Sequence, residues 1–151
     1  MASIIHDVGD TFLTLYKGFS VTLRNLFGKT TTERYPEVPP SVQPRYRGIH
    51  VLQRDENGLE KCVACFLCSA ACPANCIYIE AAENTETNRI SAGDRYAKVY
   101  NIDYSRCIFC GFCVEACPTD AITHGHDITL APYNINSMLY RKNQLIQHNI
   151  D

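Results

Sequence analysis

Two cysteine runs with identical spacing constrain this chain more strongly than any other feature of its sequence. Each run reads C-x2-C-x2-C-x3-C-P, and the runs span residues 62–73 and 107–118, an offset of 45 residues. This spacing is the bacterial pattern for binding a 4Fe–4S cluster. Two residues between neighbouring cysteines let the backbone curl around a cubane, so that three thiolates reach three of its corners. The repeat therefore predicts a duplicated domain that holds two 4Fe–4S clusters.

The fourth cysteine of each run predicts how ligands are shared between the two clusters. We expect it to begin a short helix that leads away from the cluster of its own run. In two-cluster ferredoxins this cysteine ligates the other cluster. We therefore assign the first cluster to Cys62, Cys65, Cys68 and Cys117. The second cluster is assigned to Cys107, Cys110, Cys113 and Cys72.

Zinc and disulfides are the alternatives to iron–sulfur clusters. Zinc sites favour two separated C-x2-C pairs, whereas each run here places three cysteines within seven residues. Nine cysteines cannot all form pairs, and the first residues lack a secretory pattern, so we expect a reducing compartment in which disulfides are rare. The ninth cysteine, Cys76, aligns with Ala121 and is predicted to be a buried packing thiol. A spare ligand or a redox sensor is the alternative for it.

The sequence divides into four stretches around these runs. Residues 1–28 predict an amphipathic helix that docks on a membrane surface or a partner, since apolar residues recur every three or four positions over residues 4–27. Residues 29–48 predict an extended connector, because four prolines interrupt any helix. Residues 49–131 contain both cysteine runs and predict the ferredoxin domain. Residues 132–151 predict an arm or short helix that packs on a neighbour or folds back.

The predicted fold class is α+β, a duplicated bacterial-type ferredoxin core with a helix, a connector and an arm added. Strands are expected at residues 77–80 and 98–102 and at Ile122, with a polar loop over residues 83–94 between the first two. The apolar neighbours of the cysteines are expected to exclude water from the clusters; they are Val63, Phe66, Leu67, Ile108, Phe109, Phe112 and Val114. Glycine at position 111, where the first run has Phe66, predicts two clusters that are not electronically identical.

Outside the cysteines, few residues suggest chemistry. His124 and His126 predict a solvated turn, and His50 and His148 are expected at the surface. The arginines Arg34, Arg45 and Arg47 are either solvated charges or a docking patch for a partner or acidic headgroups. The net charge of −2 gives no footprint for nucleic acid, and no apolar run is long enough for a transmembrane helix. No catalytic grouping is apparent, so we expect no small-molecule substrate on this chain and one-electron transfer as its chemistry.

The order of these motifs carries a resemblance to a known family. The first cysteine run begins as Glu60-Lys61-Cys62-Val63-Ala64-Cys65, and two motifs precede it: Glu33-Arg34-Tyr35-Pro36 and Pro44-Arg45-Tyr46-Arg47-Gly48. The second run continues as Cys117-Pro118-Thr119-Asp120-Ala121-Ile122. The chain thus resembles subunit I of NADH:quinone oxidoreductase, respiratory complex I, over roughly residues 10–140. The chain departs from the family pattern in two places. Gln43 stands where many members have a second proline, and the C-terminal arm ends early.

This resemblance implies an electron-transfer subunit of the peripheral arm, part of an oxidoreductase without a substrate site of its own. Electrons would pass through the two clusters, called N6a and N6b in that family, towards the terminal cluster and quinone. The first is held there by residues matching Cys62, Cys65, Cys68 and Cys117, the second by those matching Cys107, Cys110, Cys113 and Cys72. The implied partners are the other peripheral-arm subunits and the quinone-site membrane subunit, with residues 1–28 along the membrane. The implied location is peripheral, on the cytoplasmic side of a bacterial inner membrane.

Two other functions compete with this one. A related membrane-bound hydrogenase or ferredoxin-oxidising complex would use the same relay with a different electron donor. A soluble two-cluster ferredoxin would carry electrons between partners by diffusion. A soluble carrier would leave residues 1–48 and 132–151 unexplained, which favours a fixed subunit.

Overall fold

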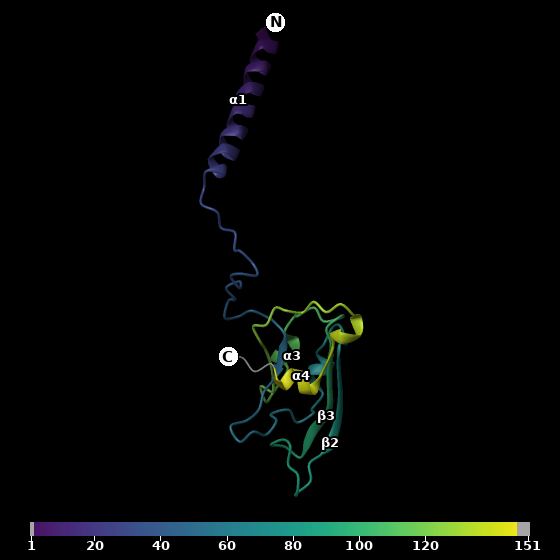
Figure 1. Ribbon diagram of the computed structural model, residues 1–151. Coiled ribbons are helices and arrows are strands. Elements are labelled where there is room, and N and C mark those ends of the chain that lie inside the picture. Colours follow the sequence, from purple (N-terminus) through teal and green to yellow (C-terminus); the bar gives the residue numbers. More distant parts are fainter. Residues whose placement is uncertain (1, 148–151) are drawn as a thin grey trace. The chain divides into compact units, whose positions relative to one another are not determined.

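The computed structural model describes residues 2–147, and these belong to two units, Met1–Ser41 and Val42–Asp151 (Figure 1). Helix α1 (Ala2–Leu26) forms the first unit together with part of the connector. Its end is closed by Gly28, whose backbone N–H donates to the carbonyl of Asn25 at 3.1 Å. All α1 side chains from residue 6 onwards are exposed, the apolar ones included. No described helix is long and apolar enough to cross a membrane.

Two small antiparallel sheets organise the second unit. Strand β1 (His50–Leu52) pairs with β4 (Ile122–His124). The second sheet has the order β2-β3-β5, and its third strand is β5 (Leu139–Arg141). Strands β2 (Ile77–Glu83) and β3 (Arg95–Asp103) form the long hairpin visible in Figure 1. The predicted strands are therefore confirmed, and β2 and β3 are longer than expected. Strand β1 has no counterpart among the sequence predictions.

Two one-turn helices carry the third cysteine of each run. They are α2 (Leu67–Ala70) and α3 (Phe112–Glu115). The expectation that a helix begins at the fourth cysteine is wrong: α2 ends before Cys72 and α3 before Cys117. The physical reason is the proline that follows each fourth cysteine, because the residue before a proline is disfavoured in the α conformation.

The C-terminal arm folds back onto its own domain. It consists of a 3₁₀ turn η1 (Ile135–Met138), strand β5 (Leu139–Arg141) and helix α4 (Lys142–Gln147). Strand β5 extends the hairpin by pairing with β3, and Leu145 of α4 is fully buried in the core. Of the two possibilities left open by the sequence, the described part of the arm takes the second. His148 lies outside the described residues.

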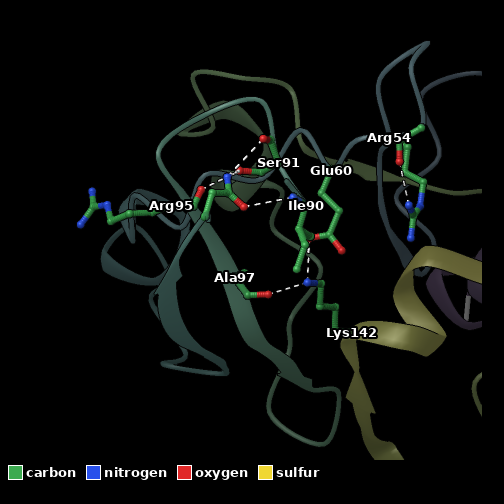
Figure 2. Close-up of polar contacts among 9 residues, drawn as sticks. Arg54, Glu60, Ile90, Ser91, Arg95, Ala97 and Lys142 are labelled. Carbon is green, nitrogen blue, oxygen red and sulfur yellow. Dashed lines mark hydrogen bonds and ion pairs between the residues drawn. The ribbon is translucent and has the colours of Figure 1, made fainter. Parts of the chain in front are cut away.

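A buried ion pair fixes the arm. The Lys142 ammonium lies 2.7 Å from a carboxylate oxygen of Glu60 and also donates to the carbonyl of Ala97 in β3, as Figure 2 shows. The two charged side chains are only 14% and 9% exposed. Truncating one partner of such a pair leaves the other charge buried without compensation, which makes the pair a determinant of stability.

Candidate metal centres

Left-handed residues shape both cysteine loops in the same way. Ala64 and Phe109 occupy matching positions with φ of 51° and 53°, and Phe66 and Gly111 match with φ of 66° and 84°. Only Gly111 adopts this conformation without steric strain, since a Cβ disfavours it by about 1–2 kcal/mol. These turns curl each loop so that its thiols point inwards, as the spacing predicts. The duplication therefore extends from the sequence to the backbone.

Each curled loop encloses one side of a thiol-lined cavity. The structure gathers the eight thiols of the two runs in two groups of four, each with three members from one run and one from the other, and the ninth thiol, Cys76, also lines the second cavity. The first cavity is lined by Cys62, Cys65, Cys68 and Cys117. The second is lined by Cys72, Cys107, Cys110 and Cys113.

The rest of each lining is almost wholly apolar. Hydroxyl groups of Tyr100 and Thr119 are the polar additions to the first cavity. The ring of His50 and the thiol of Cys76 are those of the second. Among residues 2–147, no three His, Cys, Asp or Glu side chains converge closely enough to hold a single metal ion. Four thiols around an apolar cavity fit a larger, thiophilic group, and an iron–sulfur cluster is such a group.

The electrostatics of the thiols favour a positively charged occupant. Burial, together with the neighbouring thiols, raises the pKa of Cys62 to about 11 and that of Cys113 to about 12. Cys117 differs, because hydrogen bonds from Thr119 and the backbone outweigh burial and lower its pKa. Metal binding requires thiolates and releases their protons. The positive charge of the iron would stabilise those thiolates.

His50 corrects one prediction. It is buried, not at the surface, and its Nε2 lies 3.4 Å from Cys113 Sγ. Its Nδ1 lies 3.2 Å from the hydroxyl of Tyr104, which also accepts the His50 backbone N–H at 2.9 Å. Burial and nearby His124 lower the His50 pKa to about 3, so the ring is neutral. Strand β1 places it there, and a strand of three residues is too short for a sequence pattern to predict.

His124 is a second correction. It is half-buried in β4 rather than in a solvated turn, with its ring 4.4 Å from that of His50. Its Nδ1 donates to the carbonyl of Gly48 at 3.0 Å, and burial lowers its pKa. His126 is exposed in a bend, as expected. Arg47, one of the three arginines interpreted as solvated charges or a docking patch, donates to the backbone carbonyl of Cys110.

Two further features complete the surroundings of the thiols. Cys76 is buried, as predicted, and its sulfur lies 3.4 Å from that of Cys72. The expected apolar shield is only partial, because several of its members face outwards: Phe66, Leu67, Ile108 and Phe112 are 41–65% exposed. Phe66 and Ile108 still line the first and the second cavity, whereas Leu67 and Phe112 begin α2 and α3 and line neither of these two cavities.

The chain is similar to a family model, to two relatives and to one solved structure. Residues 61–121 match the family model of the 4Fe-4S dicluster domain. NADH-quinone oxidoreductase subunit I 1 of Solibacter usitatus is 60% identical over 146 residues, which cover 97% of this chain and 87% of the relative. NADH-quinone oxidoreductase subunit I 2 of Koribacter versatilis is 67% identical over 135 residues, 86% of this chain and 77% of that protein. A solved structure of an archaeal membrane-bound sulfane sulfur reductase is 36% identical, with a TM-score of 0.44 over 69% of this chain and 48% of that one.

The fold and the two thiol-lined cavities define a two-cluster iron–sulfur protein of the ferredoxin kind. The sequence identity to the two relatives, and the share of each protein that the alignments cover, show which family within this class the chain belongs to. The chain belongs to the subunit I family of NADH-quinone oxidoreductase, a family of iron–sulfur electron-transfer subunits.

Proposed function

We propose that this chain relays electrons through two 4Fe–4S clusters towards the terminal cluster and quinone of a NADH-quinone oxidoreductase. The observation that carries this proposal is the pair of cavities within one small core, each lined by three thiols of one run and the fourth thiol of the other. Helices α2 and α3 pack against each other, and the thiols of Cys68 and Cys113 are near enough to interact electrostatically. Two redox groups in adjoining cavities suit transfer from one to the other.

The proposed ligands are those assigned from the spacing. Cys62, Cys65, Cys68 and Cys117 would hold the first cluster, and Cys107, Cys110, Cys113 and Cys72 the second. Bound there, each cluster would accept and release one electron at a time. The protein binds the irons, locks the two halves together through the exchanged fourth cysteines, and supplies hydrogen bonds to the sulfurs. One such bond runs from the Ala121 backbone N–H to Cys117 Sγ at 3.2 Å.

Iron and acid-labile sulfide analysis of the anaerobically purified protein tests this function. About eight of each per chain, with electron paramagnetic resonance (EPR) signals of two clusters after dithionite reduction, is the expected result. One zinc per chain, or no sulfide in protein protected from oxygen, would overturn the proposal. Normal clusters in a chain that purifies alone and never sediments with membranes would favour a soluble carrier.

The proposed partner of α1 is the membrane-facing part of the complex. Its exposed side chains include Phe12, Phe19 and Leu26, each 69–73% exposed, and a helix with so much free apolar surface needs a surface to lie on. We place it along the quinone-site subunit at the cytoplasmic face of the inner membrane. Deleting residues 1–27 should leave both clusters intact and release the chain from membranes. Unchanged co-sedimentation of that truncated chain would contradict this role.

A further inference from the structure

The third cysteine of each run lies in an equivalent and unusually buried position. Cys68 is the second residue of α2, and Cys113 is the second residue of α3. Their residue exposures are 7% and 6%, so water has little access to either sulfur. Hydrogen bonds to these two sulfurs must therefore come largely from the protein.

Each of these sulfurs has one buried polar side chain within hydrogen-bond distance. The Tyr100 hydroxyl lies 3.4 Å from Cys68 Sγ, and His50 Nε2 lies 3.4 Å from Cys113 Sγ. Both partners are almost completely buried, at 1% and 2% exposure. The two contacts are thus shielded from solvent and alike in length, although the two side chains differ chemically.

The strand registers show that the two side chains occupy matching places. In the β2–β3 pair, Ile79 lies opposite Tyr100. In the β4–β1 pair, His124 lies opposite His50. Ile79 and His124 are themselves related by the 45-residue offset of the repeat. Tyr100 and His50 are therefore structural counterparts, and each comes from the half of the chain opposite to the run whose third cysteine it contacts.

The hydrogen-bond chain at His50 sets the direction of donation. A thiolate that binds iron has no hydrogen and accepts only, so Nε2 must carry the ring hydrogen. Nδ1 is then an acceptor for the Tyr104 hydroxyl, which in turn accepts the His50 backbone N–H. Each donor and acceptor in this series of hydrogen bonds therefore has one consistent role. Tyr100 has one hydroxyl hydrogen and can donate it to Cys68 Sγ directly.

We propose that Tyr100 and His50 are paired positioning residues that tune the two clusters separately, Tyr100 through Cys68 and His50 through Cys113. The proposal deepens the proposed function, on which it rests. Reduction adds negative charge that is shared by the sulfur ligands, and a hydrogen bond to a ligand sulfur stabilises the reduced form. Each donor therefore raises the reduction potential of the cluster whose ligand sulfur it contacts. Because one donor is a phenol and the other an imidazole, the two clusters have different potentials.

EPR-monitored redox titration of the full chain in its assembled complex tests the proposal. His50→Phe keeps an aromatic ring and removes the donor, and it should shift the cluster of Cys113 to a more negative potential. We expect up to about a tenfold change in the equilibrium constant for reduction, about 59 mV for one electron. His50→Gln retains an N–H and should restore part of the shift. The matched control, Tyr100→Phe, removes a single oxygen and should shift the other cluster alone.

The outcomes separate this proposal from the proposed function. Unmodified protein without iron and sulfide would defeat the function itself. Full iron content with unshifted potentials in His50→Phe and Tyr100→Phe, or an equal shift of both clusters in either variant, would overturn the paired tuning while leaving the relay intact. If His50→Phe fails to assemble its cluster, His50→Gln and Tyr100→Phe decide the question by the same titration.

Discussion

The two cavities share one backbone design but differ in the side chains around it. The last matching pair of left-handed residues, Asn75 and Asp120, has φ of 49° in both halves, so the duplication is closely kept beyond the cysteines. The differences are in side chains: Phe66 replaces Gly111, and Cys76 replaces Ala121. Duplication thus fixes where the thiols lie, and substitutions at equivalent positions make the two environments distinct.

Arg47 makes the second environment more positive. A Cβ at Gly111 would lie 3.0 Å from Arg47 Nε, so the absence of a side chain gives the guanidinium room beside the loop. There it donates to the carbonyl of Cys110. At the matching position of the first loop, Phe66 has a side chain. A cation beside one cavity favours the more negative, reduced state of its occupant, which adds to the inequality of the two halves.

The largest expected effect comes from breaking the exchange of fourth cysteines. Cys72→Ala, combined with Cys76→Ala so that the neighbouring thiol cannot substitute, should remove the cluster of the second cavity. Iron should fall by about half, because the first cavity keeps its four thiols. Iron analysis and EPR check this result.

Cys117→Ala is the matched variant from the other half. It should remove the first cluster and spare the second. Loss of the first cluster from the Cys72 and Cys76 double variant would show that each run keeps its own fourth cysteine, contrary to the grouping around the cavities.

The next effect concerns the arm, which adds a strand to the β2–β3 hairpin. Lys142→Met leaves the carboxylate of Glu60 buried without its partner and should destabilise the domain by about 3–5 kcal/mol. Thermal unfolding of the holoprotein, followed by circular dichroism, measures the loss as a lower midpoint. Adding Glu60→Gln removes the buried charge and should recover most of it. An unchanged midpoint in the single variant would contradict a structural role for the ion pair.

The sequence predicted the two duplicated cysteine loops well because their pattern is local. Two residues between neighbouring cysteines determine the loop, and a 45-residue offset reveals the duplication without any tertiary information. The surroundings of the thiols depend on pairing between distant segments. His50 lies 63 residues from Cys113 and reaches it through a three-residue strand paired with β4. Tyr100 and His50 also differ by 50 rather than 45 positions, so the repeat in the sequence does not relate them.

A smaller effect tests the strain in the two loops. Gly111→Ala places a Cβ on a residue with φ of 84° and against Arg47, and it should destabilise the holoprotein by about 1–2 kcal/mol. In the first loop the matched pair is Phe66→Ala and Phe66→Gly, which both remove a ring that lines the first cavity. At φ of 66° only glycine is free of the strain, so Phe66→Gly should be the more stable of the two. Thermal midpoints of the three variants check this order. A Phe66→Gly variant no more stable than Phe66→Ala would show that the left-handed conformation is not a source of strain in this loop.

The smallest expected effect makes the two halves more alike at the ninth cysteine. Cys76→Ala gives the first half the residue that the second half has at Ala121, and it removes a thiol 3.4 Å from Cys72 Sγ. Both clusters should remain, because Cys76 is a neighbour of a proposed ligand rather than one itself. The cluster of the second cavity should become slightly harder to reduce, by less than a tenfold change in the equilibrium constant, or under about 59 mV. Redox titration and iron analysis check this prediction. Loss of four irons would make Cys76 a ligand. A potential shift confined to the first cluster would contradict the place of Cys76 beside the second cavity.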